Sequence, residues 1–292
     1  AELLLRKAIE LNPNVAEVYS NLGITLKNLG RLKEAELFLR KAIKLNPNVA
    51  EVHSNLGITL KNLGRLKEAD FSLRKAININ PDFADAHFNL SNLELLSGDY
   101  NHGLINYEFR FKKKKPTLIH ANPIIKRIDS KQLGKDDQIL VVSEQGLGDT
   151  LQYMRYIPYL RNQGINISFC AQEKLHTLIK ASKIDQNPLN AAQANTVSDG
   201  TWIPLLSIPR YLNVNPTNPI TTNKYIYSTD ELIMKWNDML GKEKKRIVGI
   251  NWQGNKELET TYQGRSIPLE IFSKITSHND IKVVSLQKGF GT

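Results

Sequence analysis

The sequence contains a single cysteine, Cys170, so it cannot form an internal disulfide bond. A chain of 292 residues without disulfides is typical of a reducing compartment, and we therefore predict a cytoplasmic protein. Cys170 falls in a strand-like run, where a small buried side chain is expected rather than a catalytic thiol. Long apolar runs and a signal peptide are also lacking, which predicts no transmembrane segment. Because Ala1 lies within a repeat pattern, we expect the natural N-terminus to lie upstream of it.

Motifs that hold metal ions are likewise missing from the sequence. It has no His-Glu-x-x-His and no Asp-x-Asp in a suitable loop, and its six His residues are scattered. Asp136 and Asp137 are adjacent rather than spaced, and they come just before a strand-like run. We therefore predict neither a metal site nor another bound cofactor.

The charge of the chain is strongly basic, with a net charge of +10 and a pI near 9.5. An excess of this size tolerates nucleic acid or other anionic partners. Part of it is local, in the four lysines of residues 112–115. No RNA-binding signature accompanies this run, so we interpret it as a solvated connector and expect no nucleic-acid partner.

The first third of the chain is repetitive. Residues 16–49 and 50–83 are near copies of each other, and a more divergent third unit begins at Ala84. The period of 34 residues is typical of tetratricopeptide repeats, which are helix pairs that stack into a curved solenoid with a concave face. Residues 1–15 are expected to be the second helix of a preceding repeat. The characteristic positions hold the same residues in both units: Leu22 and Leu56, Gly23 and Gly57, Gly30 and Gly64, Ala35 and Ala69, Pro47 and Pro81.

The third unit, residues 84–111, loses the pattern towards its end. Gly103 replaces the usual Ala, and Arg110 takes a position that is normally small. We interpret this unit as the cap at which the solenoid, residues 1–111, meets the next domain.

Three asparagines, Asn21, Asn55 and Asn89, recur at one position on the first helix of each unit. They are therefore expected to form a ladder on the concave face, where side-chain amides can bond both N–H and C=O groups of an extended peptide. This ladder resembles that of the O-linked N-acetylglucosamine transferases, whose repeats guide protein substrates. The alternative is that asparagine is a common filler at this position and serves the stability of the repeat. Protein binding and a structural role both stay open.

The remainder of the chain predicts an α/β fold. Residues 112–137 are basic and interrupted by Pro116, Pro123 and Gly134, which indicates a linker. Strand and helix patterns then alternate, as expected for a parallel sheet with covering helices. Residues 187–223 are rich in Asn, Pro and Thr, and we expect 202–209 within them to be a loop that lines a cleft. The expected strands are 139–143, 165–170, 246–251 and 281–286, and the expected helices are 150–161, 173–182, 229–240 and 269 to about 277.

A Gly-rich turn links the first of these strands to its helix. Gly146 and Gly148 would let backbone N–H groups approach a ligand at the start of that helix. Asp149 supplies a potential proton acceptor, and Glu144 is a second acid that we expect to bond the backbone. The Gly-x-Gly pattern is weak evidence alone, because the third Gly of a dinucleotide-binding fingerprint is missing.

Several segments, taken in order, resemble the heptosyltransferase-like (family 9) glycosyltransferases and the bacterial tetratricopeptide proteins that carry such a domain. The resemblance implies a GT-B fold, in which two facing Rossmann-like lobes hold a nucleotide-sugar donor, mainly through the second lobe. It divides the chain into a first, acceptor-side lobe at 138–241 and the start of a donor-side lobe at 242–292. We expect this second lobe to be incomplete, because a doubly wound domain needs on the order of 100 residues. The segments are 107–110, 144–149, 147–158, 204–209, 248–255, 265–269 and 285–289.

The resemblance also assigns roles in the first lobe. Sugar transfer needs a base for the acceptor hydroxyl and positive charge for the leaving diphosphate. Asp149 matches the aspartate of the family's Gly-Asp loop and is the candidate base. Its alternative role is to cap a helix that begins at Thr150. Gln152 and Arg155, one helical turn apart, either face the cleft or have exposed or structural roles.

In the second lobe, Arg265 matches the basic residue that family members place on the donor phosphate, since a guanidinium binds such oxygens through two bonds. An ordinary surface arginine is the alternative. Gly254 and Asn255 would shape the loop beneath, and Lys288 lies in a loop after a further strand.

These features together predict a glycosyltransferase that moves a sugar from a nucleotide-sugar donor to a hydroxyl of a protein or glycan, with repeats that recruit the substrate or a partner. The alternative is a non-catalytic scaffold whose repeats bind protein and whose glycosyltransferase-like domain is degenerate. The donor, the acceptor and the oligomeric state cannot be predicted.

Overall fold

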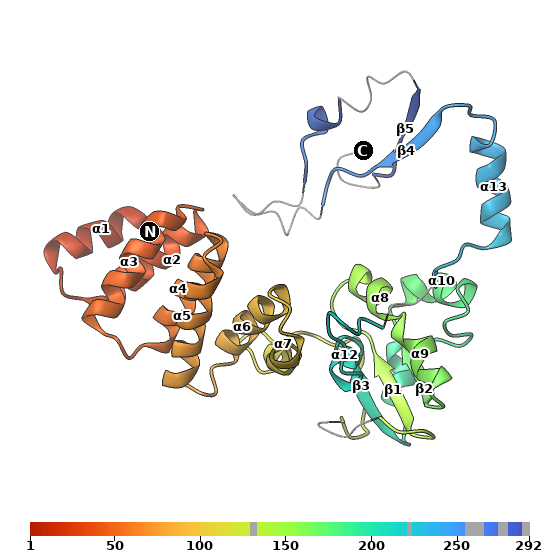
Figure 1. Cartoon of the computed structure of the whole chain (residues 1–292), viewed down its shortest axis with the longest axis horizontal. Helices are drawn as coiled ribbons and strands as arrows, with labels where there is room; N and C mark the ends of the chain where they lie inside the picture. Colours follow the sequence, from red (N-terminus) through yellow and green to blue (C-terminus); the bar gives the residue numbers. More distant parts are fainter. Residues whose placement is uncertain (129–132, 221–223, 255–265, 274–279, 288–292) are drawn as a thin grey trace.

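The repeats form a series of helix pairs in the computed structural model, which describes residues 1–128, 133–220, 224–254, 266–273 and 280–287. Figure 1 shows these pairs stacked one after another from the N-terminus. Residues 1–111 contain α1 (Glu2–Leu11), α2 (Ala16–Asn28), α3 (Leu32–Leu45), α4 (Ala50–Asn62), α5 (Leu66–Ile79), α6 (Ala84–Leu96), α7 (Tyr100–Tyr107) and the 3-10 helix η1 (Glu108–Phe111).

Close approach between the two helices of each repeat explains its small residues. A Cβ atom on Gly23 would lie 2.7 Å from Cγ of Leu39, and one on Gly57 would lie 2.6 Å from Cγ of Leu73. Both leucines are buried with the small residues of the second helices, so each repeat covers the apolar face of the next. Gly64 takes a φ of +78° at the turn between the helices, a backbone conformation that favours glycine.

Ion pairs repeat along the solenoid with the same period. Arg31 binds Glu34 in its own repeat and Glu2 in the preceding helix, with nitrogen–oxygen distances of 2.6 and 2.8 Å. Arg65 does the same one repeat later, with Glu68 and Glu36, both at 2.6 Å. The third repeat reverses the charges, because Asp99 and His102 stand at the positions of the Arg and the Glu. The regular ladder therefore ends at the last repeat.

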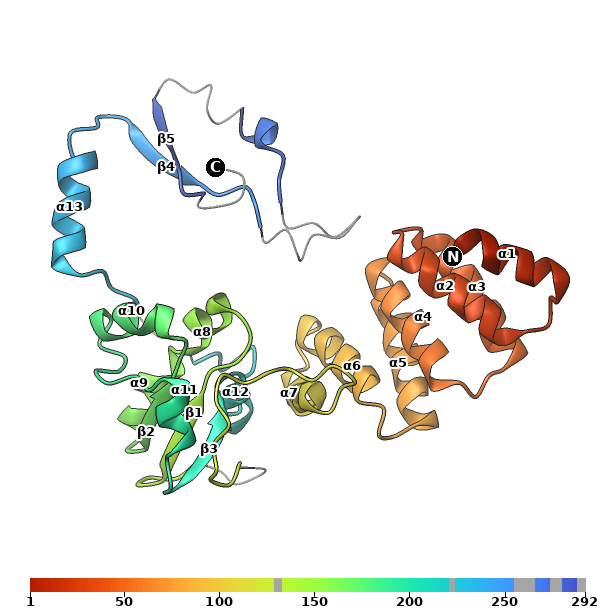
Figure 2. The same cartoon turned by 180° about the vertical axis from the view of Figure 1, so that it is seen from behind.

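The α/β part contains a three-stranded parallel sheet in the order β2-β1-β3, with helices on both faces (Figures 1 and 2). Ile139 and Val141 of β1 point into a core formed with α9, and Leu140 and Val142 point into a smaller one with α11. Both faces of the central strand are thus covered. The elements are β1 (Gln138–Val142), α8 (Leu147–Tyr153), α9 (Tyr156–Asn162), β2 (Asn166–Cys170), η2 (Glu173–Leu175), α10 (His176–Ala181), α11 (Ala191–Asn195), β3 (Thr201–Pro204), η3 (Leu205–Ser207) and α12 (Ile208–Tyr211).

Two predictions for this part are wrong. The segment 202–209, expected to be a cleft-lining loop, begins in strand β3, which pairs with β1, and continues into η3 and α12, whose Leu205 and Ile208 are fully buried. The helix expected at 150–161 is split into α8 and α9. Pro158 has no N–H to donate to the carbonyl of Met154, four residues earlier, so the helical hydrogen bonds are interrupted at Met154, between the two helices.

The last part of the chain contains a helix and a pair of parallel strands. Of the helix expected at 269–277, the described residues form only the short turn η5, and 274–279 lie outside them. The prediction of two Rossmann-like lobes rests on the two small parallel sheets and stays a prediction. The elements are α13 (Asp230–Leu240), β4 (Arg246–Ile250), η5 (Leu269–Phe272) and β5 (Ile281–Ser285).

Candidate functional site

The inner side of the solenoid is formed by the first helices of the repeats. Helix α4 contacts both α2 and α6 directly, which places these three helices on the shorter side of the curve. Asn21, Asn55 and Asn89 lie on these helices, so the expected ladder lies on this side. Asn21 is exposed, and Asn55 and Asn89 are half-buried. For Asn21 and Asn89, the described residues provide no hydrogen-bond partner to the side-chain amide.

The middle rung of this ladder already has intramolecular partners. Nδ2 of Asn55 donates to the carbonyl of Glu51 at 2.9 Å, and Oδ1 accepts from Nζ of Lys27 in the preceding repeat at 2.8 Å. Burial lowers the pKa of Lys27 below its usual value. Asn55 therefore joins two repeats and fits the structural role. Asn21 and Asn89 fit the binding role.

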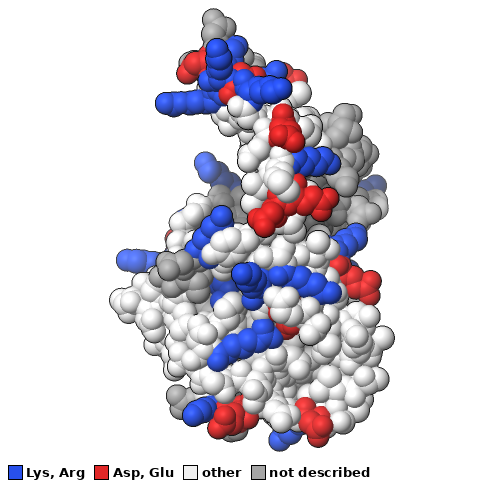
Figure 3. All heavy atoms as spheres, turned by 90° about the vertical axis from the view of Figure 1, so that its right-hand side faces the viewer, with Lys and Arg blue, Asp and Glu red and all other residues white. Residues whose placement is uncertain are grey.

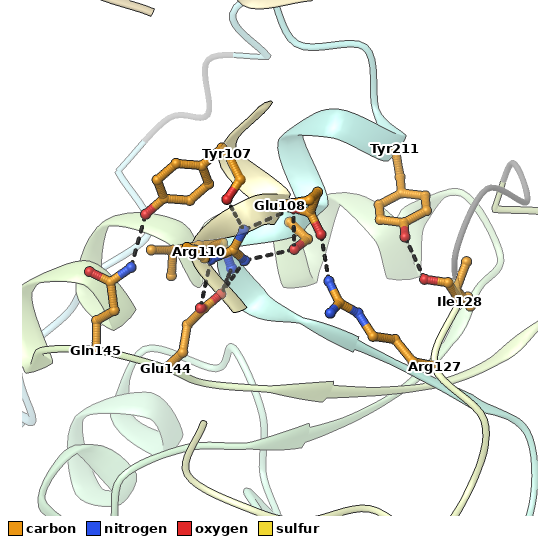
Figure 4. A network of polar contacts seen from close by, with 10 residues as sticks. Tyr107, Glu108, Arg110, Arg127, Ile128, Glu144, Gln145 and Tyr211 are labelled. Carbon is orange, nitrogen blue, oxygen red and sulfur yellow. Dashed lines mark hydrogen bonds and ion pairs between the residues drawn. The ribbon is translucent and has the colours of Figure 1, made fainter. Parts of the chain in front are cut away.

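The solenoid is joined to the α/β part by a buried ion pair (Figure 4). Nε and Nη2 of Arg110 donate to the two carboxylate oxygens of Glu144, at 2.9 and 2.8 Å, and neither side chain is exposed. Oε1 of Glu144 also accepts from the backbone N–H of Leu206 at 3.1 Å. Burial would lower the pKa of Arg110, but the hydrogen bond and charge of Glu144 raise it overall. Glu144 is thus held inside the junction by η1 and η3.

Further side chains extend this network. Glu108 binds both Arg110 and Arg127, and Oγ of Ser207 links it to the same cluster at 2.8 Å. The ring of Phe111 lies against the guanidinium groups of Arg110 and Arg127, at 4.1 and 4.5 Å from its centroid. Gln145 donates to the hydroxyl of Tyr107 at 2.9 Å (Figure 4). The last repeat therefore contacts the loop after β1, the linker and η3 at once.

The Gly-rich loop after β1 holds Asp149 in a helix cap of a different kind from the one expected. Helix α8 begins at Leu147 rather than at Thr150, and Gly146 is its N-cap residue. The backbone N–H of Gly146 donates to Oδ2 of Asp149 at 3.0 Å, which is the return bond of a capping box. Asp149 as a whole is half-buried.

The other residues predicted near this loop have different surroundings from those of Asp149. Gly148 is exposed, and a Cβ atom there would meet nothing within 4 Å. Gln152 is exposed. Arg155 is half-buried between the two short helices, and its Nη2 donates to the hydroxyl of Tyr156 at 3.1 Å. Arg155 thus has a local partner, whereas the side chain of Gln152 has none among the described residues.

A cavity of about 520 Å³ opens at the carboxyl ends of β1 and β2. This edge is where parallel α/β sheets ordinarily bind ligands. Oε1 of Gln172 accepts from Oγ1 of Thr150 at 2.8 Å, while its buried Nε2 has no partner within the described ranges. The residues around the cavity are His120, Gln145, Gly146, Leu147, Gln172, Glu173 and Lys174.

Most predicted donor-side residues lie outside the described part of the chain, namely Asn255, Arg265 and Lys288. Gly254 is described, and its backbone N–H donates to Oγ of Ser266 at 3.1 Å. The predicted role of Arg265 on the donor phosphate, opposite Asp149 as the base, stays a prediction because Arg265 is not among the described residues.

Three general properties bear on the possible ligands. The described ranges contain no group of three or more His, Cys, Asp or Glu side chains that could hold a metal ion. Among the helices of these ranges, none has both the length and the apolar character that a membrane crossing requires. On the face seen in Figure 3, Lys and Arg side chains lie in a short row across the middle, side chains of both charges lie above it, and the surface below is mostly uncharged apart from its lower edge. The basic excess is therefore not one continuous surface on this face.

Sequence reasoning did not identify the partners of Arg110. The sequence does mark this position as unusual, because Arg110 stands where Ala42 and Ala76 stand in the preceding repeats. The sequence could not show that Glu144 and Ser207 would receive this side chain.

Comparison with known proteins supports the first part of this description. The tetratricopeptide repeat family model matches residues 16–49, and a second tetratricopeptide repeat model matches residues 38–71. The chain contains tetratricopeptide repeats. The prediction made from the 34-residue period is thus confirmed, and no match supports a heptosyltransferase-like domain. A search of curated proteins finds no match to this chain.

Solved structures with similarity to the chain include proteins described as MamA. One, described as the crystal structure of MamA, is 26% identical over 38% of this chain, with a TM-score of 0.35. Another, MamA from Desulfovibrio magneticus RS-1, is 19% identical over 37% of this chain, also with a TM-score of 0.35. The chain covers 64% and 60% of the lengths of these two structures, less than two thirds of either.

Proposed function

We propose that this chain is a protein-interaction scaffold whose tetratricopeptide repeats bind an extended polypeptide on their inner side. The observation that carries the proposal is the regular stack of helix pairs, because solenoids of this kind present extended concave surfaces for binding. Asn21 and Asn89 add polar groups suited to the purpose, since each amide has both a donor and an acceptor for a peptide backbone.

The α/β part supports a scaffold more than a catalyst. Both oxygens of Glu144 are occupied by Arg110 inside a buried junction, and Asp149 accepts a backbone hydrogen bond in a helix cap. The two acids of the Gly-rich loop thus have structural partners. In this proposal the α/β part docks on the last repeat and fixes the end of the solenoid.

A peptide-display selection with the purified full chain tests the proposal. We expect the selected peptides to bind with micromolar affinity and to lose about fivefold or more when Asn21 and Asn89 are both replaced by Ala, because two peptide-backbone bonds are removed. Asn48→Ala, at an exposed turn outside the inner side, is the matched control and should leave the affinity unchanged. Selected peptides that are indifferent to the double variant would overturn the inner-side proposal.

Sugar transfer is the second candidate function. The cavity at the carboxyl ends of β1 and β2 favours it, because the Gly-rich loop and the unpartnered Nε2 of Gln172 border a space large enough for a small ligand. Asp149 would be the base and Arg265 the phosphate-binding residue. Calorimetry with uridine, guanosine and adenosine diphosphates, followed by turnover of nucleotide sugars with Asp149→Asn, separates the two functions. A scaffold binds none of the nucleotides.

A further inference from the structure

Each second helix of the three repeats exposes a large apolar side chain at the same position. Leu37 on α3 is 64% exposed, Phe71 on α5 is 74% exposed and Ile105 on α7 is 52% exposed. They are separated by 34 residues, so they lie in a row along the outer side of the solenoid, opposite the ladder of asparagines. Leu3 of α1 holds the same position one repeat earlier. Single exposed apolar residues are ordinary, but a row with the period of the fold is a continuous surface.

Lysines flank this row on the same helix faces. Lys33 and Lys41 lie four residues before and after Leu37, and Lys67 and Lys75 lie four residues before and after Phe71. Residues four apart are neighbours on a helix surface. All four lysines are exposed, and no carboxylate among the described residues pairs with them. The arginines of the same helices are already neutralised, as in the pair of Arg40 with Glu36 at 2.8 Å. The row is therefore apolar at its centre and positively charged at its edges.

The row ends at a cavity between the last repeat and the α/β part. Ile105 and Leu104 border this cavity from α7, and Val214 and Arg210 border it from the region of α12. Its volume is about 310 Å³, enough for a large side chain. The cavity thus continues the apolar centre of the row and adds a further basic side chain.

We propose that this outer surface, the row of Leu37, Phe71 and Ile105 with its flanking lysines, binds an acidic amphipathic helix of a partner protein. Arg40 of α3 binds Glu68 of α5 at 3.0 Å, so successive members of the row lie on second helices that follow one another along the solenoid. An amphipathic helix lying across these helices presents apolar residues at regular intervals along one face. A partner helix with an apolar residue at every seventh position keeps such a face over several turns.

The charges select the partner. Glutamates beside the apolar residues of such a helix would face the lysines, which is the complementarity that fixes partner and register. A second copy of this chain would instead set lysines against lysines across the contact, and like charges there are unfavourable. The surface is distinct from the inner side, so this inference does not depend on the proposed binding of an extended peptide.

A synthetic 22-residue peptide with leucine at every seventh position and glutamate at the flanking positions tests the proposal by fluorescence anisotropy with the full chain. We expect saturable binding that weakens as salt is raised. Phe71→Ser should weaken it by about tenfold, as for a central apolar contact, and the paired change Lys67→Glu and Lys75→Glu by a similar factor. Asn21→Ala, on the inner side, should leave the binding unchanged. A control peptide with lysine in place of glutamate should not bind to the native chain.

Phe71 is exposed, so its replacement should leave thermal unfolding unchanged, and that measurement separates binding from folding. Absence of binding, or binding indifferent to Phe71→Ser, overturns the proposal. Sedimentation with phosphatidylserine vesicles and ultracentrifugation of the chain alone are run in parallel. Phe71-dependent binding to vesicles but not to the peptide would assign the surface to a membrane, and Phe71-dependent dimers would assign it to a second copy; either result overturns the acidic-helix partner.

Discussion

Arg110 at the end of the solenoid and Glu144 in the loop after β1 form a buried ion pair through two hydrogen bonds, with nitrogen–oxygen distances of 2.9 and 2.8 Å. Arg110 holds the position at which Ala42 and Ala76 let the next repeat approach. The last repeat thus replaces a small residue by a long cationic one, and the α/β part takes the place that a further repeat would occupy. The following predictions begin with this pair.

Removing one partner of the pair should be strongly destabilising. Arg110→Met would leave the buried carboxylate of Glu144 without its counter-charge, and such a loss costs about 3–5 kcal/mol. Urea unfolding of the full chain, followed by circular dichroism, measures this free energy. The double variant Arg110→Met with Glu144→Leu should recover most of the loss, because no charge then stays buried unpaired. Equal losses in the single and double variants would contradict an energetic role for the pair.

Gly57→Ala should destabilise the solenoid by about 1–3 kcal/mol. The added Cβ atom would lie 2.6 Å from Cγ of Leu73, so either the helix pair separates or the leucine leaves its rotamer. Thermal unfolding reports the change. Gly148→Ala is the matched control, since nothing lies within 4 Å of its Cβ position, and it should unfold at the same temperature as the native chain or slightly above it. Similar shifts for both variants would argue against close packing at Gly57.

Asp149→Ala should cost about 1 kcal/mol of stability, within the range for the loss of a helix cap. The N–H of Gly146 would lose its acceptor while the fold around it stays the same. Chemical unfolding measures the effect. The control is Gln152→Ala, at an exposed position on the same helix, and it should change the free energy of unfolding little. A variant as stable as the native chain would show that the capping bond contributes nothing.

The stability of the chain should fall between pH 9 and pH 11 in a way that depends on Cys170. Burial raises the pKa of this thiol from 9.0 to about 11, so the folded state holds the proton more tightly than the unfolded state does. The resulting contribution is complete below pH 9 and is lost as the pH rises through about 11, up to about 2–3 kcal/mol. Unfolding curves of the native chain and Cys170→Ala at pH 8, 10 and 11 should diverge across this interval. Parallel curves would contradict the prediction.

The sequence predicts the repeats well because their signal is local and periodic. The helix pairs begin and end close to the residues expected, since the same small residues return every 34 positions. Strand β3 escapes prediction because Trp202 and Ile203 stand in a segment of Asn, Pro and Thr, and only pairing with β1 reveals them as a strand. The split between α8 and α9 depends on Pro158, whose effect is visible in the sequence but is outweighed by the helical pattern around it.

The candidate site is predicted less completely than the fold. The Gly-rich loop is found at the end of a strand, as expected, but the partner of Glu144 is not, because Arg110 comes from another part of the fold. Contacts of this kind depend on tertiary placement and leave no periodic trace in the sequence. The sequence shows only that a long cationic side chain, Arg110, stands at a repeat position that normally holds a small residue.

The matching ion pairs at successive joints have an evolutionary consequence. Arg31 and Arg65 reach the same two kinds of partner, so the boundary before residues 16–49 is equivalent to the boundary after them. Gain or loss of a whole unit of 34 residues would rejoin complementary surfaces, whereas a change of any other length would not. Array length can thus vary among descendants while the terminal repeat, with its reversed Asp99–His102 pair, keeps its attachment to the α/β part.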